Sequence, residues 1–336
     1  MEKKKKLIVC YIGQDVEKTL SLSLDSIKSI ADYIIFVDGG SKDKTLDILK
    51  KFGFNDYTEE PVPKYKLIHR EYEHSHKGAN GRARNCYLDF IKKHFKEEWC
   101  LVLDPDEIVT NPEKIKEMIN TLDDKKQWII SPKMEHLIYC LGFVDATQPE
   151  HFVPGRLFNI NEELFYPEIE HPVLQSKVSN VRFNANIFTI WHLAYCKEMF
   201  ELRKKILTHR KKSTIHSPQF LDWWYHSHLA GEYPVRKIEL SSLPKIIKKY
   251  FMIDEDYLYF KNRGIEAKHG IMVKQWYKHF KPSTVLDLGC GRGPYLFFWD
   301  MVCDAWGLEK SDWAFNNSFI KDRTLHGDCL LYTSDA

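Results

Sequence analysis

Two short apolar segments near the start of the chain, separated by a stretch of helical periodicity, constrain the fold more than any other feature. Residues 7–12 and 33–37 have the length and composition of buried strands. Strands joined through a helix run parallel, because the connection is too long for a hairpin. The sequence therefore predicts an α/β fold built on a parallel sheet. The apolar residues of the intervening helix are Val16, Leu20, Leu22, Leu24, Ile27 and Ile30.

A carboxylate and two glycines follow the second of these strands. Asp38 leads into Gly-Gly-Ser-Lys-Asp-Lys-Thr, which suits a loop that opens a helix. In open α/β sheets, ligands bind at the carboxyl ends of the strands. We therefore predict that Asp38 contacts a nucleotide; the alternative is that it caps the following helix.

Further carboxylates follow a third apolar segment, residues 100–103. Pro105 ends the strand ladder because proline has no N–H to donate. Asp104 and Asp106 would repel one another unless a cation lay beside them, and a divalent cation with bound phosphates meets this need. The alternative is a solvated turn, since Asp-Pro-Asp is also a good turn sequence. The nucleotide interpretation of Asp38 favours the metal site.

These segments, in this order, resemble family 2 glycosyltransferases of the GT-A fold. The resemblance rests on residues 7–52, on Gly-Ala-Asn-Gly-Arg-Ala-Arg-Asn-Cys-Tyr-Leu at 78–88 and on the acidic motif, and it covers roughly two-thirds of the chain. It implies that Asp38 contacts the nucleoside and that Asp104 and Asp106 coordinate Mn²⁺ or Mg²⁺ on a nucleotide-sugar diphosphate. Other residues implied to bind the nucleotide sugar are Asp15, Arg82, Arg84, Asn85 and, again, Asp104.

Three later motifs, at residues 154–158, 166–171 and 190–195, resemble the acceptor-side half of the branch that builds lipopolysaccharide cores. The last motif implies that His192 is a metal ligand. The middle motif reads Glu170-His171, where the family usually has His-Glu, so the catalytic base stays open between Glu170 and Glu168. The alternative for both acids is a solvent-facing edge strand.

The amino-terminal loop departs from the family as well. Family members commonly carry Asn-Glu where this chain has Asp15 and Val16. Asp15 is expected to substitute in nucleotide binding, whereas Val16 cannot. These departures leave a second interpretation, a non-catalytic module that binds a nucleotide sugar or a glycan.

A second signature occurs at residues 282–294, where an apolar strand enters a loop of the form Asp-x-Gly-x-Gly-x-Gly. Glycines allow the backbone to approach a cofactor, and an acid after the next strand can hold a ribose. The pattern resembles motif I of class I S-adenosylmethionine-dependent methyltransferases. The residues implied to bind S-adenosylmethionine are Asp287, Gly289, Gly291, Gly293, Glu309 and Asp328.

The expected organisation is a GT-A domain at residues 1–230, a helical linker at 231–270 and a Rossmann-like methyltransferase domain at 271–328. Too little chain follows Ser283 to bury a complete methyltransferase core, so we expect that domain to be truncated, with S-adenosylmethionine bound only by a full-length protein. Residues 329–336 are expected to be sequencing-adaptor read-through.

The composition of the chain bears on its binding partners and on its location in the cell. A net charge of +2 argues against a nucleic-acid-binding protein. The eight cysteines form no Cys-x-x-Cys pair, which suits a reducing cytoplasm. The lysines at positions 3–6 precede too few apolar residues for a signal peptide or membrane span, although peripheral contact with anionic lipid is left open. The expected reaction is an inverting sugar transfer from a nucleotide sugar, UDP-sugar favoured, to a glycan or lipid-linked glycan.

Overall fold

The computed structural model describes residues 4–57, 60–71, 79–138, 142–147, 154–169, 172–196, 217–229, 233–238, 243–250 and 267–327. The chain separates into two compact units, which we describe one at a time. The first comprises residues 1–135 and 148–192, and the second comprises residues 136–147 and 193–336. The predicted boundaries at residues 230, 270 and 328 stay predictions.

The first unit alternates strands and helices over its first half and is mainly β in its second half. Its helices are α1 (Leu20–Ile27), α2 (Thr45–Phe52), α3 (Ala79–His94) and α4 (Glu113–Thr121). Its strands are β1 (Leu7–Gly13), β2 (Tyr33–Asp38), β3 (Tyr65–His69), β4 (Trp99–Leu103), β5 (Glu107–Thr110), β6 (Trp128–Ile138), β8 (Leu157–Asn159), β9 (Leu164–Phe165), β10 (Gln175–Ser176) and β11 (Val181–Tyr195), of which β6 and β11 continue into the second unit.

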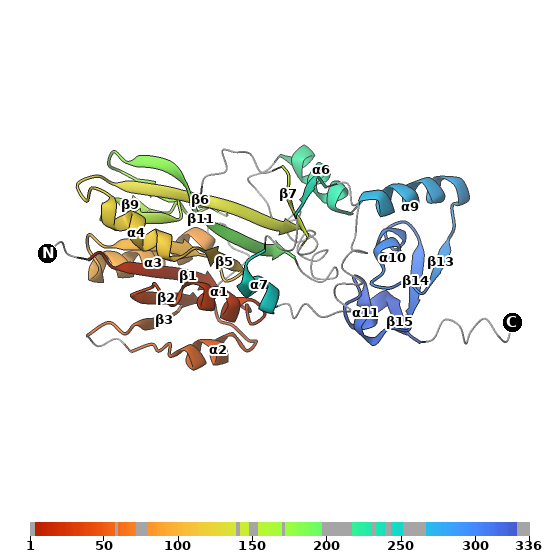
Figure 1. Ribbon diagram of the computed structural model, residues 1–336, viewed down its shortest axis with the longest axis horizontal. Coiled ribbons are helices and arrows are strands. Elements are labelled where there is room, and N and C mark those ends of the chain that lie inside the picture. The colour runs from red at the N-terminus through yellow and green to blue at the C-terminus, as the bar shows by residue number, and fades with distance from the viewer. Residues whose placement is uncertain are drawn as a thin grey trace. The chain divides into compact units, whose positions relative to one another are not determined.

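The central sheet has the order β6-β8-β4-β1-β2-β3. Figure 1 shows β1, β2 and β3 side by side in it. β4, β1, β2 and β3 run parallel to one another, whereas β8 pairs antiparallel with β4 and β6, and β5 pairs antiparallel with β11. The predicted parallel pair is therefore confirmed. A mixed α/β unit with a mostly parallel central sheet is consistent with the GT-A fold.

Helices cover both faces of this sheet because its inner strands are apolar on both sides. Leu7, Val9 and Tyr11 of β1 pack in one buried cluster with apolar residues of α1, α2 and α4. The alternate residues Ile8 and Cys10 pack in a second cluster with apolar residues of α3. Parallel strands that are buried on both faces have continuous apolar sequences. This explains why β1 and β2 could be predicted from the sequence.

The carboxyl ends of the parallel strands meet at one edge of the sheet. Gly13 of β1 is in register with Asp38 of β2, which is in register with His69 of β3. On the other side of β1, Tyr11 is opposite Leu103, the last residue of β4. The predicted strand end before Pro105 is therefore confirmed, and the Asp38 and Asp104 motifs are brought to the same edge.

The second unit contains a small parallel sheet in the order β13-β14-β15. Aromatic residues of α9 and α10 stack beside it, among them Trp276 and Trp299. β12 is a strand within the segment expected to be a helical linker. The elements are β7 (Phe143–Asp145), α6 (Pro218–Leu229), β12 (Val235–Lys237), α7 (Lys245–Tyr250), α9 (Ala267–Phe280), β13 (Thr284–Leu288), α10 (Pro294–Trp299), β14 (Asp304–Glu309), α11 (Asp312–Asn316), the 3₁₀ helix Lys321–Arg323 and β15 (Thr324–His326).

Among the residues that the structure describes, no helix combines the length and the apolar composition needed to cross a bilayer.

Candidate active site

Asp104, the residue that follows β4, is held between two arginines. Nη2 of Arg84 on α3 donates to Oδ1 at 2.7 Å, and Nη2 of Arg156 donates to Oδ2 at 3.1 Å. Burial by itself raises the pKa of the Asp104 carboxyl, but the guanidinium of Arg84, followed by that of Arg156, outweighs it and holds the pKa well below its usual range. Asp104 is therefore ionised throughout the physiological pH range.

Glu107 is fully buried beneath this pair. Its Oε1 accepts a hydrogen bond from Nη2 of Arg156 at 2.5 Å, and its Oε2 accepts one from the backbone N–H of Asp104 at 2.7 Å. Burial raises the pKa of Glu107 to about 7, against the opposing effect of Arg156. No sequence pattern indicated a role for Glu107 or Arg156. The available signal was an arginine just before the buried strand β8 in the motif at 154–158.

Asp106 and His192 come together although they are far apart in the sequence. β11 pairs with β5 so that His192 lies opposite Glu107, the residue after Asp106. Nε2 of His192 is 3.4 Å from Oδ1 of Asp106, and about a fifth of each side chain is exposed. Carboxylate oxygens suit Mg²⁺ and Mn²⁺ and imidazole nitrogens suit softer divalent metals, so the pair is a mixed donor set for a divalent cation.

The geometry also bears on the solvated-turn alternative. The backbone N–H of Glu107 donates to the carbonyl of Asp104 at 2.9 Å, so the Asp-Pro-Asp segment does form a turn. Its two carboxylates are only partly exposed, Asp104 at 27% and Asp106 at 20%, so the turn is not a freely solvated one. Within the described part of the chain, no group of three or more His, Cys, Asp or Glu side chains is arranged to hold a metal. Coordination of a cation by Asp104, Asp106 and His192 therefore stays a prediction.

Asp38 organises the loop that follows β2. Its buried carboxylate accepts hydrogen bonds from the backbone N–H of Gly40 at 3.0 Å and from the hydroxyl of Ser41 at 2.6 Å. Helix α2 begins at Thr45, whose backbone N–H donates to Oδ1 of Asp43 at 2.9 Å, whereas Asp38 binds Gly40 and Ser41 of the preceding loop, so Asp38 does not cap that helix. Asp38 therefore faces a loop at the ligand-binding edge of the sheet, and its predicted contact with a nucleoside stays a prediction.

Asp15 anchors the same loop from the end of β1. It adopts a positive φ of 53°, and its Oδ1 accepts hydrogen bonds from the backbone N–H groups of Lys42 at 2.7 Å and Asp43 at 3.3 Å. The residue is thus placed beside the Asp38 loop, as a nucleotide-binding role would require. That role itself stays a prediction.

The first turns of α3 contact the acceptor-side segment. Nδ2 of Asn85 donates to the carbonyl of Tyr166 at 2.9 Å, and Oδ1 of Asn85 accepts from the backbone N–H of Tyr166 at 2.9 Å. Nη1 of Arg82 is 3.3 Å from Oε2 of Glu168, whose side chain is 60% exposed. Glu168 lies in a bend, not in an edge strand. Glu170 lies outside the described residues.

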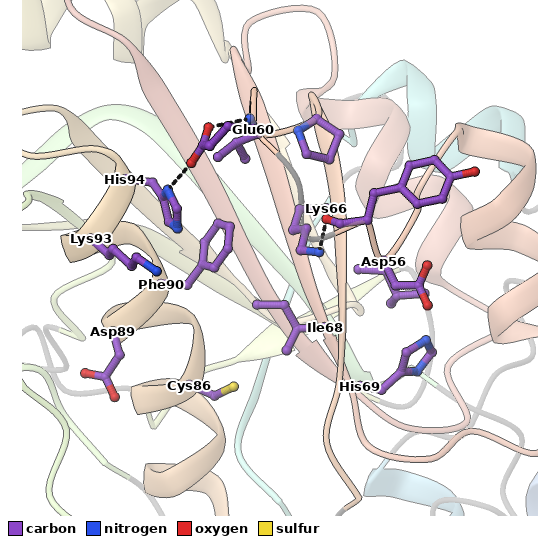
Figure 2. A pocket seen from close by; sticks show the side chains of 14 residues that line it. Asp56, Glu60, Lys66, Ile68, His69, Cys86, Asp89, Phe90, Lys93 and His94 are labelled. Carbon is purple, nitrogen blue, oxygen red and sulfur yellow. Dashed lines mark hydrogen bonds and ion pairs between the residues drawn. The ribbon is translucent and has the colours of Figure 1, made fainter.

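A cavity of about 620 Å³ lies on the other side of α3, between that helix and β3 (Figure 2). Its wall on α3 is formed by Cys86, Asp89, Phe90 and Lys93. His69 also lines it, and Nδ1 of His69 is 3.8 Å from Oδ2 of Asp38. The cavity therefore borders the Asp38 loop, and sequence analysis gave no sign of it.

The glycine-rich loop of the second unit has the backbone geometry that its glycines allow. Gly289, Gly291 and Gly293 have φ values of 67°, 58° and 76°. The carboxylate of Glu309 accepts hydrogen bonds from the backbone N–H of Gly291 at 2.6 Å and of Ser311 at 2.7 Å.

Asp287, on the strand before that loop, lies in a different electrostatic setting from Asp104. Burial, with a smaller contribution from Glu309, raises the pKa of Asp287 to about 6. Asp328, the last residue of the expected cofactor site, lies outside the described residues. Binding of S-adenosylmethionine at this loop stays a prediction.

Several solved structures show distant similarity to the chain. S. aureus TarS is 16% identical, with a TM-score of 0.37, and the match covers 67% of this chain and 71% of that one. Glucosyl-3-phosphoglycerate synthase from Mycobacterium tuberculosis, in complex with Mn²⁺ and UDP-glucose, is 16% identical with a TM-score of 0.28; the match covers 39% of this chain and 44% of the synthase. The chain thus spans less than half the length of that synthase.

A sequence profile gives the family. Comparison with curated proteins yields no match. The profile described as Glycosyl transferase family 2, by contrast, matches residues 7–201, more than half of the chain and nearly all of the first unit. This range includes the Asp38 loop, the acidic turn and the strand that carries His192. The chain therefore belongs to glycosyl transferase family 2.

Proposed function

We propose that the protein transfers a sugar from a nucleotide-sugar donor, a UDP-sugar, to a hydroxyl of a glycan or lipid-linked glycan, with inversion at the anomeric carbon and with Mn²⁺ or Mg²⁺ as cofactor. Family membership supports a glycosyltransferase. The observation that carries the finer proposal is the cluster at the end of β4, where Asp104 lies between Arg84 and Arg156 and the adjacent Asp106 lies beside His192.

Asp106 and His192 would hold the cation. Two protein ligands are sufficient, because a divalent cation in such sites is commonly completed by substrate phosphates and water. When bound, the cation would neutralise charge on the diphosphate leaving group. Asp104 has both carboxylate oxygens engaged by arginines, so we assign it to orienting Arg84 and Arg156 and to an outer position toward the cation.

Arg84 and Arg156 are suited to the donor diphosphate. Both side chains are only 12% exposed, and the buried Nε of each has no hydrogen-bond partner among the described residues. Guanidinium groups recognise phosphate oxygens through several donors at once. Asp38, with Asp15 supporting the same loop, would contact the nucleoside at the neighbouring strand end.

The acceptor hydroxyl needs a base. Glu168 or Glu170 would take the hydroxyl proton as the acceptor oxygen forms its bond to the anomeric carbon, and the electron pair of the broken carbon–oxygen bond would leave with the diphosphate. Glu168 is exposed enough to meet an acceptor, and its ion pair with Arg82 keeps it close to α3. The acceptor itself would bind on this side of the site.

A donor screen tests this function. Thermal shift of the whole chain with a panel of nucleotide sugars, each with and without Mn²⁺, should give its largest shift with a UDP-sugar plus Mn²⁺. Slow release of UDP, abolished by EDTA and by Asp106→Asn, should follow. Metal-dependent binding without any release of UDP would favour the alternative, a non-catalytic module that binds a nucleotide sugar or a glycan.

The free thiols are in keeping with a cytoplasmic protein, where nucleotide sugars would be available. Cys10, Cys86, Cys100 and Cys303 form no disulfide among the described residues. Cytoplasmic location is therefore part of the proposal.

A second function, binding of S-adenosylmethionine by the glycine-rich loop, is favoured by one observation. The carboxylate of Glu309 stands at the end of β14, beside the parallel strand β13 and against the N–H of Gly291, where it could accept hydroxyl groups of a ribose. Calorimetry with S-adenosylmethionine on this chain and on Glu309→Gln tests both this assignment and the expectation that only a full-length protein binds. Binding that Glu309→Gln removes would support the loop and overturn that expectation, whereas binding that the variant leaves unchanged would remove the assignment.

A further inference from the structure

One stripe of α3 follows the acceptor-side segment along its length. The stripe consists of Gly81, Asn85, Leu88 and Lys92, which lie three or four residues apart and so share one helix face. The segment, residues 164–168, leads to Glu168 and is called the acceptor segment below. Contacts with it occur at the beginning, the middle and the end of this stripe.

Asn85 makes the central contact. Its amide donates to the carbonyl of Tyr166 and accepts from the N–H of the same residue, both at 2.9 Å. An asparagine that bonds both backbone groups of one residue fixes the two peptide units on either side of that residue. Tyr166 is 4% exposed, so an unpaired backbone group there would be costly.

Gly81 makes the closest contact. A Cβ atom at this position would lie 2.2 Å from the carbonyl oxygen of Pro167 and 2.9 Å from the Cα of Glu168. Because both neighbours are backbone atoms, they could make room only if the acceptor segment moved. The glycine therefore sets how closely the segment approaches the helix.

Lys92 holds the opposite end of the acceptor segment. Its Nζ donates to the carbonyl of Leu164 at 2.6 Å, and Leu88, between Lys92 and Asn85, is fully buried in the same cluster as Leu164 and Tyr166. The stripe thus combines a close backbone approach, a two-way amide contact and a lysine clamp.

The same helix also reaches the donor side. Arg84, next to Asn85 in the sequence, binds Asp104 at 2.7 Å and lies over the ring of Tyr166, 5.9 Å from its centroid. A single helix therefore contacts both the acidic turn and the acceptor segment within two consecutive residues.

We propose that Asn85 and Gly81 are positioning residues for sugar transfer: they fix the acceptor segment, and with it Glu168, relative to the donor site built around Asp104. The inference rests on the proposed transferase function. It gives Asn85 a role on the acceptor side of the site, in contrast to the contact with the nucleotide sugar that the family resemblance implies.

The test compares Asn85→Ala and Gly81→Ala with Lys93→Gln. Lys93 is an exposed residue of the same helix that faces the cavity of Figure 2 and makes no ion pair or hydrogen bond among the described residues, so its variant is a matched control. Circular dichroism and thermal unfolding identify any variant that fails to fold. Asn85→Ser, which keeps a short polar side chain and sets no acid against the Tyr166 carbonyl, is the milder second variant.

Three measurements are made on each protein. Hydrogen exchange at the Tyr166 amide should become about tenfold faster in Asn85→Ala and stay unchanged in Lys93→Gln, because one hydrogen bond is lost. The affinity for UDP with Mn²⁺ should stay within about twofold of the parent. The kcat for release of UDP from UDP-glucose should fall by about tenfold or more at unchanged KM, because the base and not the donor is displaced.

Two results would overturn the inference. A fall in UDP affinity of about tenfold in Asn85→Ala would place Asn85 in the donor pocket, and an unchanged Tyr166 exchange rate or kcat would show that the stripe does not control the segment. Failure of the proposed function looks different: the parent would neither bind UDP nor release it from UDP-glucose, while the exchange rate would still report whether the stripe fixes the acceptor segment.

Discussion

Two aspartates that lie at or near the end of parallel strands, Asp104 in the first unit and Asp287 in the second, have opposite electrostatic surroundings. Burial raises the pKa of both. At Asp104 the guanidinium groups of Arg84 and Arg156 outweigh burial and depress the pKa, whereas at Asp287 the nearby Glu309 adds to burial and the pKa rises to about 6.

The difference shows that a carboxylate at a strand end does not by itself define its ligand. In the first unit, the arginines around Asp104 offer donors and positive charge, which suits an anionic diphosphate. In the second, Asp287 and Glu309 offer acceptors and negative charge, which suits a ligand that donates hydroxyl groups or carries a positive charge. The neighbouring charges, more than the motif, separate the two sites.

The largest effect is expected from removing Arg156, whose guanidinium group compensates the charge of the buried acids. Arg156→Ala leaves Glu107 buried without its arginine and Asp104 with one arginine partner. The free energy of unfolding should therefore fall by about 3 kcal/mol, the lower end for a broken buried ion pair. The loss is at the lower end because Glu107 can bind a proton and so avoid a buried charge. The urea midpoint of the whole chain measures it. Arg182→Ala, at an exposed arginine of β11, is the control. Equal urea midpoints in the two variants would mean that Arg156 does not stabilise the acidic cluster.

The next largest effect concerns binding of the metal ion. Asp106→Asn removes one of two proposed protein ligands and should weaken Mn²⁺-dependent UDP binding by about a hundredfold while leaving the fold intact. Calorimetry with and without Mn²⁺ measures it. Glu309→Gln, in the second unit, should have no effect on this binding. A normal affinity in Asp106→Asn would remove the assignment of the metal to the first unit.

The central strands of the first unit could be predicted from the sequence because their apolar residues are continuous. Residues 7–12, 33–37 and 100–103 are continuous apolar runs, and the structure places β1, β2 and β4 there with ends within a residue or so of those limits. Proline and glycine then marked the strand ends. The edge of the sheet that collects Asp38 and Asp104 followed from these local signals alone.

The partners of the acidic turn could not be predicted in the same way. Arg156 is separated from Asp104 by 52 positions and reaches it only because β8 pairs antiparallel with β4. Glu107 follows two turn residues and would be expected at the surface, yet the pairing of β5 with β11 buries it. Such contacts depend on tertiary packing, for which one sequence carries no periodic signal.

A smaller effect should reveal the uncompensated acid of the second unit through pH. Asp287 has an ordinary pKa of 3.8 and a pKa of about 6 in the folded protein. The contribution of its protonated carboxyl to folding stability is therefore complete below pH 3.8 and is lost as the pH rises through about 6. Asp287→Asn, which stays neutral, should therefore stabilise the second unit by about 1–2 kcal/mol at pH 8, allowing for partial screening by solvent, and have no effect near pH 4.

Calorimetric scans of the parent and the variant at both pH values measure this. Asp322→Asn, at an exposed acid of the same unit, is the control and should change neither scan. Asp104, whose pKa is depressed, has the opposite sign: its contribution is present above pH 3.8 and is lost as the pH falls. Stabilisation by Asp287→Asn that was equal at pH 4 and pH 8 would show that the carboxyl does not titrate in this range.

The smallest effect is expected at Asp38, where the predicted ligand is neutral. A hydrogen bond to a nucleoside contributes roughly 0.5–1.5 kcal/mol, so Asp38→Ala should weaken the affinity for UDP by about threefold to tenfold. Because the nucleoside does not change during sugar transfer, the lost contact affects ground state and transition state alike, and kcat should fall less than affinity. Asp38→Asn, which keeps an acceptor for the Ser41 hydroxyl, should preserve the loop and separate loop order from nucleoside contact. A variant that bound UDP normally but lost turnover would place Asp38 in the chemical step and not at the nucleoside.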